Sequence, residues 1–507
     1  MRIPVVRRNA AKKLNSAFFI RSLSLLLGVT ALAMLVPLAL AFAFGEKEML
    51  RGFAIPVGFM LCLVPAILLL TRKSEEGIES SKGLLLVGLT WLMSCLLGAL
   101  PYFLSGLLPN FTDAFFESAS GFTTTGATLF PDIEALPRSL LFWRAMAVWL
   151  GGMGMVVLTV ALAPLIGTGG FQLFRAEAPG PDKGRITPRI TATAKILWII
   201  YIALTFLQTL LLIACGMHWF DALFYSLSTI ASGGVGLKNN SIAGYNAGVQ
   251  WVIIFFMIIA GFNFNLLFKL IQGKGREILK SSETRSYGGI IFLAGIICTC
   301  ALFSGIWNRI GSLAGAVEPS IRAALFQVVA FLTTTGFAVA DYRLWPPLAQ
   351  GVLFVLMAIG GCSSSTAGGI KIIRHVILFK QASNELKRQF YPRGVFSIQI
   401  DGSEGQKDIV QGVAGFIFLY FLLVIVAALF VSSAGVDLFS SFNIGLLLIG
   451  NLGVGFVQGS LDAVLYHLPG YIKWILSFVM IAGRLELWTV VSLFYWIRLT
   501  FFRIGRG

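Results

Sequence analysis

The sequence predicts an all-α polytopic membrane protein with ten transmembrane helices and four re-entrant pore half-helices. Its composition gives the first evidence: of 507 residues, 12% are charged and 57% are hydrophobic, and glycine occurs 55 times. A soluble domain carries about 25% charged residues, so this chain lacks the polar side chains to cover a water-facing surface. Soluble enzymes and nucleic-acid-binding proteins are therefore disfavoured.

Ten apolar segments are long enough to cross the hydrocarbon core, which takes roughly 20 residues of helix. The first follows a basic N-terminal stretch and is too long for the apolar part of a signal peptide, so we expect it to be retained. The predicted spans are 20–44, 53–71, 83–107, 139–163, 193–216, 249–270, 288–306, 350–373, 409–433 and 471–498.

Basic residues are divided unevenly between the two sides that ten spans define. Most of the 39 Lys and Arg residues fall in the termini and in the loops on the same side, so the positive-inside rule places both termini in the cytoplasm. This asymmetry explains most of the net charge of +16 without any nucleic acid as partner.

Four external connections resemble one another, and this repeat determines the predicted fold. Each contains an apolar stretch too short to cross the bilayer and too apolar for water, which is typical of a re-entrant half-helix. Each stretch leads into a turn with one matched glycine: Gly126, Gly234, Gly336 or Gly453. The segments are DAFFESASGFTTTGATLF (113–130), DALFYSLSTIASGGVGLK (221–238), RAALFQVVAFLTTTGFAVAD (322–341) and DLFSSFNIGLLLIGNLGVGF (437–456).

Each half-helix and its flanking spans form one unit, so the chain divides into a helix pair and four repeats. We expect the helix pair at 1–75 and the repeats at 76–170, 171–275, 276–390 and 391–507. Asp113, Asp221 and Asp437 come just before three half-helices. We interpret them as N-caps that complement the helix dipole, rather than as ion ligands.

The four turns suit a weakly hydrated monovalent cation. A half-helix that enters from outside points the partly negative end of its dipole toward the membrane centre. Backbone carbonyls in the turn can replace the water shell of the ion, and glycine keeps side chains out of the pathway. The candidate filter residues are Thr124, Thr125, Gly126, Ser232, Gly233, Gly234, Thr334, Thr335, Gly336, Asn451, Leu452 and Gly453.

The eighth predicted span is interrupted by small and polar residues. Glycine costs about 1 kcal/mol relative to alanine inside a helix, and irregular backbone at membrane depth must be buried or line water. From the residues alone, a loop that obstructs the pore and a packing face between helices are equally supported. The candidate gate residues are Gly360, Gly361, Cys362, Ser363, Ser364, Ser365, Thr366, Ala367, Gly368 and Gly369.

Arg484 is the one basic residue predicted deep inside a span, away from either end. It lies roughly 16 Å along the helix from Lys473, close to the membrane midplane. Because an intramembrane charge is costly, it indicates a functional residue. We expect Arg484 to face the pore or the segment 360–369 and to limit how tightly the cation is held. An arginine that braces helix-end carbonyls is the alternative, and both roles are compatible.

The remaining signals are weaker. All six cysteines lie in apolar stretches without CxxC spacing, so we interpret them as small buried side chains. The three histidines are isolated in the sequence. We therefore expect no disulfide and no metal cluster. Residues 394–401 alternate like a short strand within the basic loop 374–408. With 171–192 and 271–287, this loop is either a docking face for a cytosolic regulator or an ordinary positive-inside loop.

Eight short motifs carry a family resemblance: TTTGA (123–127), WLGGMG (149–154), ASGGVG (231–236), GFNFNL (261–266), TTTGF (333–337), IGGCSSSTAGGIKIIR (359–374), GNLGVG (450–455) and GRLE (483–486). Together they resemble the Trk/Ktr/HKT superfamily of potassium transporters, most closely the bacterial TrkH/TrkG-type subunits. The resemblance covers nearly the whole chain, including the N-terminal helix pair.

The resemblance implies potassium uptake across the bacterial cytoplasmic membrane through a pseudo-fourfold pore. K⁺ would bind at the filter residues, the segment 360–369 and Arg484 would gate the pore, and no covalent cofactor would be needed. It also implies a homodimer in the lipid bilayer and a cytosolic TrkA-like regulator that carries the nucleotide. Gly126 at the first matched position favours K⁺ over Na⁺ within the superfamily.

Two other functions stay open from the sequence. A K⁺-binding subunit of an ATP-driven pump would have distantly similar filters and would leave ATP hydrolysis to a partner, because this chain has no GxxxxGK motif followed by Ser or Thr. A membrane-embedded lipid-modifying enzyme would need clustered acids or histidines at a membrane face. We therefore predict a transport protein and not an enzyme.

Overall fold

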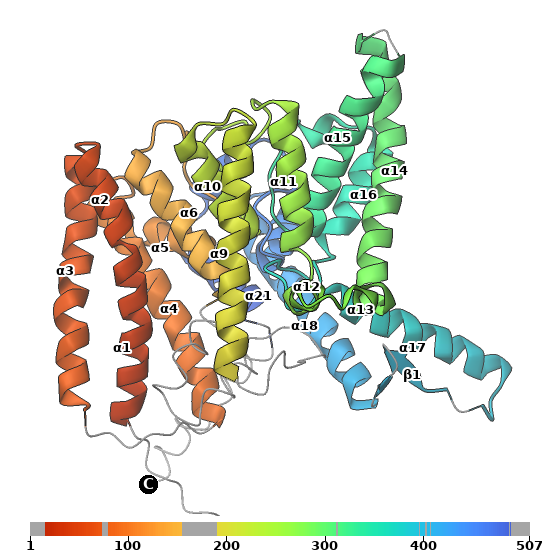
Figure 1. Cartoon of the computed structure of the whole chain (residues 1–507), viewed down its shortest axis with the longest axis horizontal. Coiled ribbons are helices and arrows are strands. Elements are labelled where there is room, and N and C mark those ends of the chain that lie inside the picture. The colour runs from red at the N-terminus through yellow and green to blue at the C-terminus, as the bar shows by residue number, and fades with distance from the viewer. Residues whose placement is uncertain are drawn as a thin grey trace, which may run out of the picture.

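The computed structural model describes residues 16–72, 80–154, 190–310, 313–394, 396–400, 403–405, 407–485 and 487. Long helices stand side by side along one direction, and shorter helices lie between them or across one end (Figure 1). Among the described residues, seven helices are long and apolar enough to cross a membrane, and a bent helix pair makes an eighth. The prediction of an all-helical polytopic membrane protein is confirmed.

Six predicted spans correspond to long helices. The first is α1 (Ser16–Ala33) continued by α2 (Leu35–Ala43) beyond a break at Met34. The other five are α3 (Lys47–Leu70), α4 (Ser80–Leu104), α9 (Ile190–Ala214), α14 (Ser282–Ile310) and α18 (Lys407–Ser432). Their outward faces carry large exposed apolar side chains such as Phe42, Leu70 and Phe292, as lipid contact requires.

One predicted span, 249–270, is wrong as a single straight helix. It consists of α11 (Ala247–Ala260) and α12 (Phe264–Ile271), which meet at an angle of 100°. The side chain of Asn263 starts the second helix by accepting a hydrogen bond from the N–H of Asn265 at 2.9 Å. An average of hydropathy over the segment does not detect this capping residue, because both helices are apolar.

The predicted span 350–373 is also not one helix. It comprises α16 (Pro347–Met357), an irregular loop, and the start of α17 (Ile372–Phe390). Two further spans are represented by α6 (Arg138–Gly152) and α21 (Gly470–Arg484), which are shorter than predicted. Residues 155–163 of one predicted span, and most of the other beyond Leu485, lie outside the described residues.

Four helices lead into the matched turns. Three of them have 12 residues, in agreement with the predicted short helices: α5 (Phe111–Phe122), α10 (Trp219–Ile230) and α19 (Leu438–Ile449). The fourth, α15 (Leu313–Leu332), has 20 residues and is longer than predicted, because helix continues through Glu318 and Pro319. Short helices follow two of the turns: η1 (Tyr342–Leu344) and α20 (Leu461–His467).

Several smaller elements lie at one end of the molecule (Figure 1). They are α12, α13 (Gly275–Lys280), the projecting α17, and an antiparallel hairpin of β1 (Ile398–Ile400) and β2 (Ser403–Gly405). The strand predicted within 394–401 is thereby confirmed. Of the other proposed docking segments, 271–287 forms part of α12 to α14, whereas 171–189 lies outside the described residues.

The cysteines are all free, but they are not uniformly buried. Cys95, Cys298 and Cys362 are buried, whereas Cys62 on α3 and Cys300 on α14 are exposed. The prediction of burial fails for these two because they lie on the outward faces of spanning helices, where a small apolar side chain faces lipid rather than protein.

Candidate functional site

The four matched turns have the same backbone conformation although their sequences differ. The residue two positions before the matched glycine has a left-handed φ in every repeat: 56° at Thr124, 55° at Ser232, 53° at Thr334 and 54° at Asn451. Such φ values are uncommon outside glycine and are strained for β-branched residues. Four independent occurrences at one register indicate that the turns are built alike.

Three of the matched glycines are also left-handed: Gly126 (φ 76°), Gly234 (φ 61°) and Gly336 (φ 78°). Only glycine adopts this conformation readily. Gly453 is not among the residues with positive φ, so the fourth turn differs at this position. There the constraint is space, since a Cβ atom would lie 2.6 Å from the carbonyl oxygen of Thr125.

The turns form a closed ring in which each one contacts the next. A Cβ atom added to a matched glycine would meet the backbone of the neighbouring turn. A Cβ atom on Gly126 would lie 2.2 Å from the carbonyl oxygen of Gly233, and one on Gly234 would lie 1.8 Å from that of Thr335. A Cβ atom on Gly336 would lie 3.3 Å from the nitrogen of Gly453, and one on Gly453 would lie 2.6 Å from the carbonyl oxygen of Thr125. The order of contact is thus first, second, third, fourth and back to the first.

Hydroxyl groups within the turns help to hold them in place. In the first and third repeats, two threonine hydroxyls bond each other at 2.8 Å: Thr123 with Thr125, and Thr333 with Thr335. All the threonine, serine and asparagine filter candidates are buried. The predicted filter residues therefore come together, although the ring has only approximate fourfold symmetry.

Two of the three aspartates predicted as N-caps have other partners. Asn110 caps α5 and His218 caps α10, whereas Asp437 does cap α19 by accepting from the N–H of Ser440 at 2.9 Å. Asp113 instead binds the Lys473 ammonium at 2.7 Å, and Asp221 accepts from the Tyr245 hydroxyl at 2.9 Å. Both carboxylates lie in the first turn of their helix, where they still complement its dipole.

The loop 360–369 is closed at its base by a bridge between Ile359 and Ile370. Its second half lies against three of the four turns. Thr366 shares a hydrogen bond of 2.9 Å with Ser232, and the N–H of Gly368 donates to the Thr334 hydroxyl at 2.7 Å. A Cβ atom on Gly368 would be 2.3 Å from the carbonyl oxygen of Gly450. The loop thus covers one side of the ring.

Arg484 joins this loop to a helix end. Its guanidinium donates to the carbonyl of Thr366 at 2.8 Å and to the carbonyls of Gly151 and Gly152 at 2.9 and 2.7 Å. The two glycines are at the C-terminal end of α6, where carbonyls lack helical partners. Contact with the loop and capping of a helix end, which the sequence presented as alternatives, therefore coexist.

A second anchor holds the other side of the loop and was missed by sequence reasoning. The Glu283 carboxylate accepts from the N–H of Ser363 at 2.5 Å and from its hydroxyl at 2.8 Å. The amide of Asn263 donates to Glu283 at 3.4 Å and to Ser363 at 3.2 Å. Glu283 belongs to a charged connection without a motif, whereas Asn263 is part of the GFNFNL motif.

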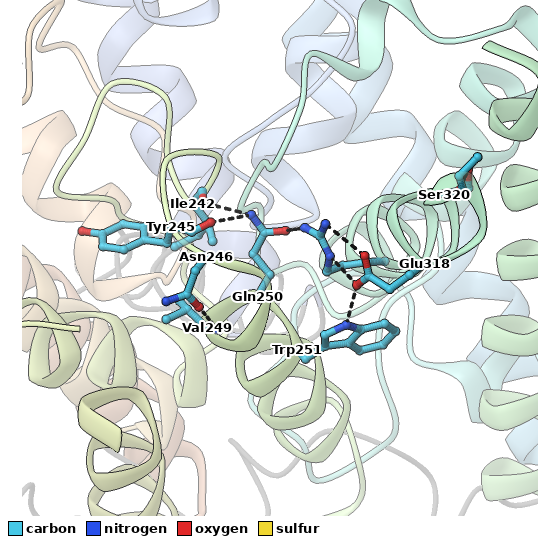
Figure 2. Close-up of polar contacts among 10 residues, drawn as sticks. Ile242, Tyr245, Asn246, Val249, Gln250, Trp251, Glu318 and Ser320 are labelled. Atoms are coloured by element: carbon cyan, nitrogen blue, oxygen red, sulfur yellow. Dashed lines mark hydrogen bonds and ion pairs between the residues drawn. The ribbon is translucent and has the colours of Figure 1, made fainter. Parts of the chain in front are cut away.

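A polar network joins the N-terminal parts of α11 and α15. The amide of Gln250 donates to the carbonyl of Tyr245 at 3.1 Å (Figure 2). Its oxygen accepts a hydrogen bond from the guanidinium of Arg322. Arg322 also binds Glu318 at 2.7 Å, and the indole of Trp251 donates to Glu318 at 2.9 Å. These contacts fix α15 against α11.

The chemistry available around the ring is that of neutral oxygens. Backbone carbonyls and hydroxyl groups surround the turns, and the described part of the chain contains no group of three His, Cys, Asp or Glu side chains suited to a metal ion. Neutral oxygens favour a monovalent cation, whereas a divalent ion usually requires carboxylates.

Comparison with known proteins gives consistent matches. The family model described as "TrkH: Cation transport protein" matches residues 51–498. The Trk system potassium uptake protein TrkH of Halomonas elongata is 38% identical over 94% of this chain and 97% of its own length. The same protein of Escherichia coli K12 is 40% identical over 83% and 87%. The crystal structure of the potassium transporter TrkH from Vibrio parahaemolyticus matches with a TM-score of 0.81 and 33% identity, covering 94% of this chain and 98% of that one.

Proposed function

This chain belongs to the TrkH family of cation transport proteins, and we propose that it takes up K⁺ through a pore along the axis of the four turns. The single observation that carries the proposal is the closed ring of turns, in which each glycine contacts the next turn. Relatives named Trk system potassium uptake proteins cover almost the whole chain, which supports K⁺ as the transported ion. The chain is a transport protein, not an enzyme.

In this proposal, the filter is formed by residues 124–126, 232–234, 334–336 and 451–453. The carbonyls of these turns replace the hydration shell of K⁺, and the four preceding helices direct their negative dipole ends toward the ion. The chain then has ten spans in four repeats after the helix pair, with α5, α10, α15 and α19 as re-entrant pore helices. Both termini face the cytoplasm.

The loop 360–369 is the gate in this mechanism. It obstructs the pathway below the ring, and Arg484 holds it there through the carbonyl of Thr366. The positive charge of Arg484 also prevents K⁺ from being held too tightly, so the ion can leave. Movement of the loop opens the pathway, and its contacts with the second, third and fourth turns support this role.

Regulation is proposed to come from outside the chain. We expect a homodimer in the cytoplasmic membrane and a cytosolic TrkA-like subunit that binds the nucleotide and docks on the basic surface of α12, α13 and α17. Two neighbouring features support the docking surface: exposed Phe379 and Phe390 on α17, and its basic last turn with Lys387 and Arg388.

A complementation experiment tests the function. We expect that cells without K⁺ uptake, supplied with this chain and a matching cytosolic partner, will grow at low external K⁺ and take up Rb⁺. No growth, although the protein is inserted in the membrane, would contradict the proposal. Uptake that required ATP hydrolysis by a partner would instead indicate the pump-type subunit.

A further inference from the structure

A buried ion pair lies directly behind the first turn. The Arg144 guanidinium on α6 approaches the Glu117 carboxylate on α5 at 2.9 Å through Nη2 and at 3.0 Å through Nε. The side chains of Arg144 and Glu117 are only 3% and 2% exposed. Neither residue is part of the filter, the loop or the arginine contact described above.

The Glu117 carboxylate also binds the segment that follows the filter. It accepts from the backbone N–H of Leu129 at 3.0 Å and from the Thr128 hydroxyl at 3.0 and 3.1 Å. Thr128 in turn accepts from the N–H of Phe130 at 3.2 Å. Because these residues begin two positions after Gly126, the carboxylate fixes the outer end of the first turn.

The other three repeats place neutral side chains at the same two positions. Nine residues before the matched glycine, where repeat 1 has Glu117, stand Tyr225, Gln327 and Ile444. At the seventh residue of the second helix, where α6 has Arg144, α11, α16 and α21 have the buried residues Ile253, Leu353 and Leu476. The ion pair is therefore confined to repeat 1.

Two of the neutral residues make contacts like those of Glu117. The Tyr225 hydroxyl accepts from the N–H of Leu237 at 3.2 Å, and Leu237 is three positions after Gly234, as Leu129 is after Gly126. The Gln327 amide donates to the carbonyl of Phe337 at 3.2 Å. In three repeats, the residue nine positions before the matched glycine thus holds the segment that follows the turn. Only in repeat 1 is this residue charged.

Packing does not require this charge. Replacing a buried ion pair by apolar residues is often neutral or stabilising, because desolvation opposes the attraction between the charges. Hydrogen bonds to a charged group are stronger and more restrictive than those to a neutral one. The other repeats carry neutral residues at the equivalent positions, so the fold does not depend on a charge there. The ion pair instead makes the first turn more rigid.

We propose that Glu117 and Arg144 are positioning residues that determine ion selectivity by fixing the outer end of the first turn. This inference rests on the proposed K⁺ transport. Selectivity depends on where the filter carbonyls are held, and the first turn is in backbone contact with both the second and the fourth. A more mobile first turn therefore loosens its contacts with both the second and the fourth turn.

The test exchanges the pair for that of repeat 3. The double variant Glu117→Gln with Arg144→Leu reproduces Gln327 and Leu353, so no unpaired charge is left in the interior. We expect the preference for Rb⁺ over Na⁺ in uptake to fall about tenfold, which corresponds to the loss of one charged hydrogen bond, with an unchanged amount of folded protein. Unchanged selectivity in a normally folded double variant would refute the inference.

Two further variants keep the test decisive. Thr128→Val removes only the hydroxyl contact with Glu117, and we expect it to lower selectivity about threefold. This variant tests the proposal even if the double variant folds poorly. Wild-type selectivity in Thr128→Val as well would overturn the proposal. The matched control is Asp341→Asn, which neutralises an exposed carboxylate paired with Arg343 at 2.8 Å in repeat 3 and should leave selectivity unchanged. If the wild-type chain takes up no Rb⁺ at all, the transport function itself fails.

Discussion

The ring of turns and the loop beside it are held together in opposite ways. In the ring, backbone lies against backbone, and a Cβ atom on Gly234 would come within 1.8 Å of the Thr335 carbonyl. The loop is held by side-chain hydrogen bonds from Arg484, Thr366 and Glu283. Such a bond contributes about 1 kcal/mol net between neutral groups and about 1.5–3 kcal/mol where one partner is charged, because water can replace it.

In the proposed mechanism, this difference separates the ring, which selects the ion, from the loop, which moves. The close backbone contacts leave no room for a side chain at Gly126, Gly234 or Gly453, and water cannot take the place of these contacts, so we expect the ring to keep one width. A loop fixed by exchangeable hydrogen bonds can leave its position and return to it. We therefore expect severe effects from small changes in the ring and graded effects from changes around the loop.

The largest effect is expected for Gly234→Ala. The added methyl group would overlap the Thr335 carbonyl, and the residue would be strained at φ 61°. We expect Rb⁺ uptake to be abolished. Gly288→Ala on α14 is the matched control, because its Cβ atom would have no neighbour within 4 Å; normal uptake by Gly234→Ala would show that the ring is not rigid.

A large increase in flux is expected when the loop is shortened within 360–369 or when Arg484 is replaced by Gln. The replacement removes charged hydrogen bonds to Thr366, Gly151 and Gly152, each worth about 1.5–3 kcal/mol. We expect Rb⁺ efflux from loaded vesicles to rise about tenfold or more without the regulator. Less folded protein with unchanged flux per molecule would instead identify a purely structural brace.

A smaller effect is expected for Thr366→Val. The Thr366 hydroxyl donates to the carbonyl of Ile230 at 2.9 Å and that of Ala260 at 3.1 Å, and it shares a hydrogen bond with Ser232. Its loss should cost about 1–2 kcal/mol and raise basal flux a few-fold, measured in the same vesicles. The comparison between ring and loop would be weakened if this variant were as inactive as Gly234→Ala.

The smallest effect concerns pH and Asp462 on α20. Burial, assisted by the nearby Glu117 charge, raises the pKa of Asp462 to about 6. The folded protein then binds a proton that the unfolded chain releases at lower pH, so stability decreases as pH rises from about 4 through 6. We expect the melting temperature to fall by about 1–2 °C over this range. The Asp462→Asn variant should lose this decrease in melting temperature between about pH 4 and 6. A variant whose melting temperature depends on pH as in the wild type would contradict the prediction.

The sequence predicted the parts of the molecule that depend on composition and repetition. Long apolar runs identified α3, α9 and α18, and the matched glycines identified the turns. The bend between α11 and α12 was missed because the cap at Asn263 is a single residue between two apolar helices. The ring order was also beyond the sequence, since it follows from contacts between distant backbone segments.

The supporting contacts were the hardest to predict. Glu117 and Arg144 are separated by 27 residues on different helices, and Glu283 is 80 residues from Ser363. No periodicity relates such partners. Comparison of the four repeats at one register would have singled out Glu117 and Arg144 as the only charged pair, because the equivalent positions carry Tyr, Gln, Ile and aliphatic residues.

The contact of Arg484 with Gly151 also bears on how the protein is made. The two residues are 333 positions apart, and Arg484 lies near the end of the chain. During synthesis, the carbonyls of Gly151 and Gly152 lack this partner until Arg484 has been translated and inserted. Because Arg484 follows all four turns in the sequence, the loop gains this contact only after the whole ring has been synthesised, and in the proposed mechanism closure of the pathway follows that step.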